Sequence, residues 1–169
     1  SFTGLLIGTL KKGQFRNEKE EDFTERLISG GQPDLYVNMH IEENDSSRVL
    51  ESYRSNVKPN NIMPEWRESF SFYIRGDPSK ATLKINAFDE DMFSEDDFIG
   101  SGELKLEHLL ANVQENEKAL VEVPVPIYEQ KQAGWFGLGG GKRRKGTVMV
   151  ELQFVPFDSD SASASADKS

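Results

Sequence analysis

The chain has 169 residues, a formal net charge of −9 and no cysteine. Its length suits one domain that buries its own core, and the missing cysteines exclude disulfide frameworks, thiolate metal sites and cysteine nucleophiles. The acidic balance argues against a nucleic-acid partner, and no run of about eighteen apolar residues predicts a transmembrane helix.

The first ten residues, SFTGLLIGTL, lack the basic start of a signal peptide, and no initiator methionine is present. Together with the absence of cysteine, this predicts a cytoplasmic domain that belongs to a longer protein.

The dominant hydrophobic period along the chain is two, which is typical of half-buried antiparallel strands. In ATLKINAF, for example, Leu83, Ile85 and Ala87 alternate with polar residues. The expected strands, in chain order, are residues 4–10, 34–41, 68–74, 81–88, 101–106, 120–125 and 146–154. Seven or eight strands separated by Gly, Pro, Asn and Asp predict an all-β, two-sheet sandwich.

Helical spacing is rare in this chain. Residues 107–114 predict a short helix or turn, whereas the charge-rich segment 18–28 fits either a helix or a solvated loop. Residues 158–169 contain too little apolar surface to offset the entropy of ordering, so we expect a disordered tail or linker there. This leaves residues 1–157 as the folded domain.

The stretch DEDMFSEDDFIG crowds six carboxylates around two apolar residues. Asp89 and Asp91 follow directly after an expected strand, and Asp97 precedes the return of the chain into the sheet. A loop of this length can bring the three carboxylates together, where they repel one another. Ca²⁺ removes that cost, because it accepts about six to eight oxygen ligands in loose geometry. The alternative is a solvated acidic loop without a ligand.

Two other metal sites fit the sequence less well. An EF-hand loop beginning at Asp89 requires glycine at Ser94 and glutamate at Gly100, and neither is present. Zinc prefers histidine and cysteine, and only the isolated His40 and His108 are available.

Three stretches, in the same order as in the family, resemble the C2 domain. They are GQPDLYVNM (31–39), IMPEWRESFSFYI (62–74) and LKINAFDEDMFSEDDFIGSGEL (83–104). With the last strand, the resemblance covers about residues 4–157. It implies an eight-stranded antiparallel C2-type β-sandwich, in agreement with the strand count.

The resemblance also implies a set of Ca²⁺ ligands, because calcium-binding C2 domains hold the ion through five aspartates in loops at one end. Four of those positions match here, and the fifth is Ile28, which implies weaker binding or fewer ions. Acidic residues of the long first loop, Glu20, Glu21 and Asp22, are candidates to replace it. The implied ligands are Asp34, Asp89, Asp91 and Asp97, with Ser94 and the carbonyl of Glu90 as further oxygen donors.

The apolar residues at the loop tip indicate a membrane role. Once Ca²⁺ neutralises the carboxylates, Met92 and Phe93 are expected to insert into an anionic phospholipid surface. The alternative for Phe93 is packing against the end of the sandwich. We therefore expect a Ca²⁺-dependent, peripheral membrane-targeting module of a larger trafficking or signalling protein.

A second unusual loop spans residues 130–146 and joins aromatic residues and glycines to four consecutive cations. Its aromatic residues suit a membrane interface and its cations an anionic leaflet, or else the aromatics pack on the sandwich while the cations stay in solvent. The residues proposed for this lipid contact are Trp135, Phe136, Lys142, Arg143, Arg144 and Lys145.

Two rival functions are open at this stage. A Ca²⁺-independent C2 domain that binds proteins or phosphoinositides is favoured by Ile28. An enzyme is not expected, because no Ser/His/Asp set or phosphate loop is present. Trp66 is expected to pack in the core.

Overall fold

The computed structural model describes residues 1–17, 31–43, 46, 48–113, 120–131, 134–135 and 140–158. Its regular elements are β1 (Phe2–Phe15), β2 (Leu35–Glu43), β3 (Ser52–Arg54), β4 (Glu65–Arg75), η2 (Pro78–Lys80), β5 (Ala81–Asp89), β6 (Asp97–Lys105), α2 (Leu106–Val113), β7 (Val121–Lys131) and β8 (Gly141–Pro156). The prediction of an all-β fold is confirmed, and the short helix expected near residue 107 is present as α2.

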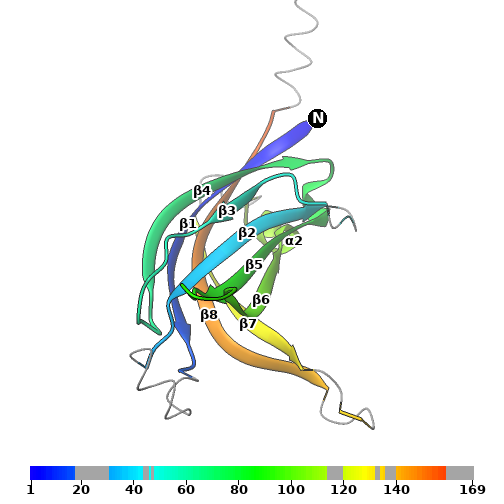
Figure 1. Cartoon of the computed structure of the whole chain (residues 1–169). Helices are drawn as coiled ribbons and strands as arrows, with labels where there is room; N and C mark the ends of the chain where they lie inside the picture. Colours follow the sequence, from blue (N-terminus) through cyan, green and yellow to red (C-terminus); the bar gives the residue numbers. More distant parts are fainter. Residues whose placement is uncertain are drawn as a thin grey trace, which may run out of the picture.

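The eight strands are antiparallel and follow the order β3-β2-β5-β6-β7-β8-β1-β4. Among the described strands, β6 and β7 are joined by a single residue pair, Ser101 with Tyr128. At this corner one layer of the sandwich ends and the other begins. Strands β3-β2-β5-β6 therefore face strands β7-β8-β1-β4 across a common core (Figure 1). This is the expected eight-stranded sandwich.

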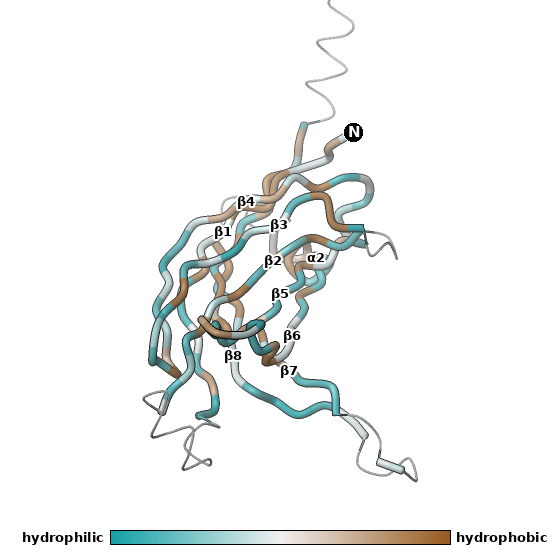
Figure 2. Tube along the Cα trace, viewed as in Figure 1, coloured by the Kyte–Doolittle hydropathy of each residue, from teal (hydrophilic) through white to brown (hydrophobic). Residues whose placement is uncertain are grey.

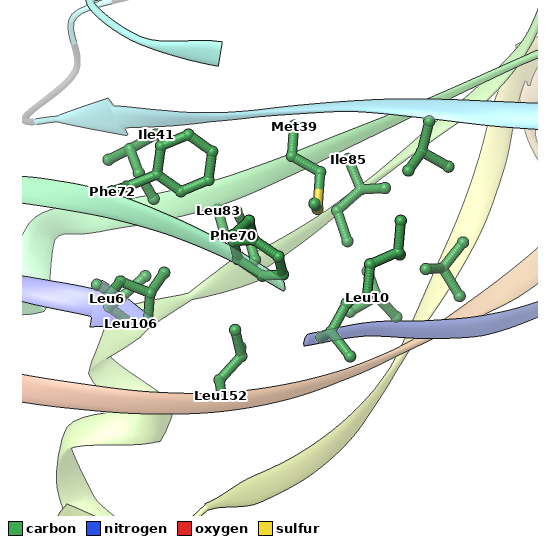
Figure 3. Close-up of a cluster of buried hydrophobic side chains, with 14 of the residues drawn as sticks. Leu6, Leu10, Met39, Ile41, Phe70, Phe72, Leu83, Ile85, Leu106 and Leu152 are labelled. Atoms are coloured by element: carbon green, nitrogen blue, oxygen red, sulfur yellow. The ribbon is translucent and has the colours of Figure 1, made fainter. Parts of the chain in front are cut away.

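The core follows from the two-residue period of the strands. Along β5 every second residue is buried, and Leu83 and Ile85 have no exposed surface. Side chains of β1, β2, β4, β5, β8 and α2 meet between the two layers, as Figure 3 shows for Met39, Phe70 and Leu152. Trp66 is 4% exposed and its indole nitrogen donates to the carbonyl of Asn56 at 3.0 Å, so its predicted core role is confirmed.

The structure corrects the sequence prediction in two places. The three-residue strand β3 carries too short a pattern to be recognised, and it pairs at the sheet edge with β2 through Tyr53 and Met39. Residues 130–146, expected as a loop, instead contain the end of β7 and the first part of β8, which pair from Lys131 with Gly141 onward. Glycine-rich and charged composition hid this hairpin, because its strands bury little surface.

Some expected features lie outside the described residues. These are the segment 18–28 with Ile28 and the candidate replacements Glu20, Glu21 and Asp22, the aromatic Phe136, and the tail beyond Asp158.

Candidate functional site

Three of the aspartates singled out in the sequence lie at the ends of three adjacent strands. Asp34 immediately precedes β2, Asp89 ends β5 and Asp97 begins β6. Asp89 lies opposite Leu35 on one side and opposite Asp97 on the other. The antiparallel register therefore brings the three carboxylate-bearing residues to one rim of the sandwich, across the order β2-β5-β6.

Backbone amide groups fix the carboxylates at this rim. The amide of Asp34 donates to Oδ1 of Asp89 at 2.8 Å, and the amide of Asn60 donates to Oδ1 of Asp34 at 2.7 Å. Asn60 has a φ of 49°, in the left-handed region that asparagine tolerates well. The Glu90 amide donates to the Asp34 carbonyl at 2.8 Å. Asp89 is only 7% exposed.

The tip of the loop between β5 and β6 is organised by Asp91. Its Oδ1 accepts from the amide of Phe93, and its Oδ2 accepts from the hydroxyl of Ser94, both at 2.8 Å. Met92 is 86% exposed and Phe93 is 99% exposed. The alternative in which Phe93 packs against the sandwich is therefore wrong.

A polar cluster that the sequence did not indicate holds the base of the same loop. The hydroxyl of Tyr36 donates to Oδ2 of Asp96, and Arg54 lies 4.0 Å from that oxygen and 3.8 Å from Oε2 of Glu90. The guanidinium of Arg54 also stacks on the Tyr36 ring at 4.1 Å. Because three different elements meet here, sequence spacing carries no signal for the cluster.

Burial and the bond to Asp96 raise the pKa of Tyr36 to about 12. The same bond, with the amide of Asp91 donating to Oδ1 at 3.1 Å, lowers the pKa of Asp96. Asp96 therefore stabilises the loop. Its role differs from that of the neighbouring aspartates, which are candidate metal ligands.

The donor chemistry at the rim is that of a hard cation, since every candidate ligand is an oxygen. Within the described part of the chain, however, no three carboxylate or imidazole groups are gathered closely enough to hold a metal ion. Oxygens of Asp34, Asp89 and Asp91 are instead engaged with backbone amides and a hydroxyl. Donor type therefore fits Ca²⁺, and the arrangement is not assembled around an ion.

The basic residues near the end of the chain differ among themselves in exposure. Lys142, Arg144 and the indole of Trp135 are exposed, the last at 95%, so Trp135 does not pack on the sandwich. Lys145 is 8% exposed and its ammonium lies 3.3 Å from Glu129. Burial and this ion pair distinguish Lys145 from the exposed cations.

Comparison with known families adds independent information to this geometry. The family model described as the C2 domain matches residues 11–121, which include the rim aspartates and the strands that carry them. The chain belongs to the C2 domain family.

Relatives of this C2 domain are found at modest identity. It is 25% identical over 131 residues to Synaptotagmin-3 of Arabidopsis thaliana, covering 78% of this chain and 22% of the relative. It is 26% identical over 125 residues to the E3 ubiquitin-protein ligase Nedd-4 of Drosophila melanogaster, covering 74% of this chain and 12% of the relative. The chain thus spans less than a quarter of either relative.

Solved structures confirm the C2 fold. A single C2 domain of plant Extended Synaptotagmin 1 has a TM-score of 0.64 and 20% identity, covering 94% of this chain and 98% of that domain. The calcium-bound pair of C2 domains of Extended-Synaptotagmin 2 gives a TM-score of 0.59 and 20% identity, covering 91% of this chain and 46% of that structure.

The chain is therefore a C2 module with a synaptotagmin among its relatives. A C2 domain is typically non-catalytic. In the part of the chain that the structure describes, no helix has the length and apolar character needed to cross a bilayer.

Proposed function

We propose that this C2 module docks onto anionic phospholipid surfaces when Ca²⁺ binds at its acidic rim. The observation that carries the proposal is the placement of Asp34, Asp89 and Asp97 on three adjacent strand ends, beside the exposed Met92 and Phe93. A calcium-bound structural neighbour of the same fold supports it further.

The residues that would hold the ion come from two loops. They are Asp34 before β2 and, after β5, Asp89, Asp91 and Asp97, with the Ser94 hydroxyl and the Glu90 carbonyl as further donors. Several of these oxygens exchange an amide hydrogen bond for the ion, and the carboxylates must move closer together. This reorganisation costs free energy, so we propose weak intrinsic affinity that strengthens when lipid is present.

The carboxylates of the rim control when docking happens. While they are charged and unneutralised, they repel an anionic headgroup layer. A bound Ca²⁺ supplies positive charge at the rim and open positions for lipid oxygens.

The apolar side chains of Met92 and Phe93 then hold the docked state. Each is almost fully exposed, so insertion removes nearly all of its apolar surface from water. Full burial of each contributes roughly 1–3 kcal/mol. No fold change is required, because both side chains already project from the rim.

A Ca²⁺-independent C2 domain is the second candidate. It is favoured because the described carboxylates do not form a metal group and because Arg54 already provides a countercharge near Glu90 and Asp96. In that case the rim would bind a protein or a phosphoinositide without an ion.

Calorimetric titration with Ca²⁺, followed by cosedimentation with phosphatidylserine vesicles, separates the two candidates. We expect measurable heat and vesicle binding that Ca²⁺ strengthens. The absence of heat at millimolar Ca²⁺, with vesicle binding indifferent to a chelator, would eliminate Ca²⁺ control.

The cellular setting belongs to the same proposal. We place the module, residues 1–157, at the cytoplasmic face of a membrane, as a peripheral, non-catalytic part of a larger trafficking or signalling protein. Residues 158–169 would serve as a linker.

A further inference from the structure

Strands β7 and β8 continue past the sandwich as a two-stranded ribbon. We call residues 128–131 and 141–144 the basic arm; they pair from Tyr128 with Arg144 to Lys131 with Gly141. Among the described strands, the ladder between β6 and β7 holds one residue pair, Ser101 with Tyr128, and the pairing of β1 with β8 stops at Gly146. Beyond these pairs the arm is paired with no further described strand, and Figure 1 shows it projecting at the lower right.

The arm is strongly positive in an otherwise acidic chain. It carries four cations, Lys131, Lys142, Arg143 and Arg144, and one carboxylate, Glu129. That carboxylate pairs with Lys145, which lies at the base of the arm. Figure 2 shows the arm as a continuous hydrophilic segment.

Two exposed cations of the arm have neutral groups as contacts, and Lys142 also acts, after Lys84, to lower the pKa of Glu103. Arg144 donates to the neutral hydroxyl of Thr147, and the ammonium of Lys142 lies 5.9 Å from the centre of the Tyr128 ring. Neither contact neutralises the cation. An isolated ribbon gains little stability from burial, so a cation-rich ribbon is better explained by a ligand of opposite charge than by packing.

Beyond the paired part of the arm lies Trp135, whose indole is 95% exposed. Indole rings suit the boundary between lipid headgroups and acyl chains, because they combine an apolar body with a hydrogen-bond donor. A cationic arm with an exposed indole beyond it is thus better suited to bind a lipid surface than to bind a purely polar polyanion.

The arm also points in the right direction. Because β5, β6 and β7 are successively antiparallel, the end of β7 lies at the same end of the sandwich as Met92 and Phe93. At about 3.3 Å per residue, the paired arm reaches roughly 10 Å beyond Tyr128. A membrane approached by the acidic rim is therefore within reach of the arm.

We propose that the basic arm is a second, metal-independent contact with anionic lipid headgroups, with Trp135 anchored at the interface. This goes beyond the Ca²⁺-controlled rim, because the charge of the arm is permanent. It gives the module a weak resting attraction to anionic membranes that precedes Ca²⁺ binding.

The test is cosedimentation of the full chain with phosphatidylserine–phosphatidylcholine vesicles in the presence of a chelator. We expect salt-sensitive binding that K142Q/R144Q weakens by up to about 30-fold, since each cation near the surface contributes about fivefold. The matched control is K80Q/K105Q, which removes two exposed cations near the opposite end of the sandwich and should bind as the natural chain does.

Tryptophan fluorescence gives a second readout, because Trp66 is buried and Trp135 is exposed. Vesicles should shift the emission to the blue, and Trp135→Phe should abolish the shift. Thermal unfolding of both double variants checks that the fold is retained.

Three outcomes would overturn the inference: no vesicle binding with the chelator, equal losses in the two double variants, or an unchanged Trp135 emission. Tighter binding to single-stranded RNA than to the vesicles would also overturn it. Asp89→Asn with Asp91→Asn should not weaken the chelator-resistant binding, because it removes only charges that repel the headgroups. A loss of Ca²⁺ control in that variant therefore reports on the rim, and a loss of chelator-resistant binding in K142Q/R144Q reports on the arm.

Discussion

The backbone amide of Asp34 donates a hydrogen bond to Oδ1 of Asp89 at 2.8 Å, which joins the segment before β2 to the end of β5. The carboxylate of Asp89 is thus an element of the apo structure as well as a proposed Ca²⁺ ligand. Substitutions at this site must be chosen so that the hydrogen bond survives while the charge is removed.

Asp89→Asn combined with Asp91→Asn meets this requirement. The amide oxygen of asparagine can still accept from the amides of Asp34 and Phe93, so the free energy of unfolding without Ca²⁺ should change by less than about 1 kcal/mol. Ca²⁺ binding measured by calorimetry should be lost, because two ligand charges are gone.

Glu95→Gln is the matched control for that double variant. It removes one exposed charge from the same loop outside the proposed ligand set. A loss of Ca²⁺ affinity as large as in the double variant would show that the overall negative charge of the loop attracts Ca²⁺, and that the proposed ligands do not bind it specifically.

Phe93→Ala should separate membrane insertion from ion binding. Because Phe93 is 99% exposed, its removal should leave the melting temperature and the Ca²⁺ affinity in solution unchanged. Vesicle affinity in Ca²⁺ should fall by roughly 1–3 kcal/mol. Leu50→Ala, at an apolar side chain 46% exposed in the loop between β2 and β3, should have no such effect, and equal losses would count against insertion.

Two tyrosines should make the free energy of unfolding fall at alkaline pH. Burial, with hydrogen bonds donated to Asp96 and Glu68, raises the pKa of Tyr36 and Tyr53 from 10.0 to about 12. A raised folded-state pKa contributes stability that is fully present below pH 10 and is lost as pH rises toward 12.

The measurement is denaturant unfolding across that alkaline range, together with the ultraviolet absorbance of phenolate. Tyr53→Phe should flatten the fall in stability and remove one late-titrating phenol. An identical pH profile in the variant would show that the bond to Glu68 does not carry the effect.

Gly102→Ala should destabilise the corner between the two layers. A Cβ at Gly102 would lie 2.5 Å from the carbonyl oxygen of Pro126, and backbone atoms cannot give way cheaply. We expect a loss of about 1–3 kcal/mol in the free energy of unfolding, measured by urea denaturation. Ser101→Ala, at the neighbouring position, is the control and should cost less.

Much of the fold could be predicted from the sequence because alternation is a local property. The burial of Leu83, Ile85 and Ala87 follows from their spacing alone. The same reasoning located Asp89 and Asp97, since a short loop flanked by paired strands must return its ends to neighbouring positions. Strand β3 and the basic arm were not predicted from the sequence, because short or solvent-exposed strands show weak alternation of apolar and polar residues.

What the sequence by itself determined is therefore the sandwich, its core faces and the strand ends that carry the acidic rim, since each depends on residues close together in the chain. The tertiary structure alone decided the partners at that rim. The Asp34–Asp89 bond joins residues 55 positions apart, and Tyr36 meets Asp96 across 60. The tertiary structure also decides that Lys145 is buried while Lys142 is exposed. Burial depends on which strands lie beside a residue and not on the composition of its segment.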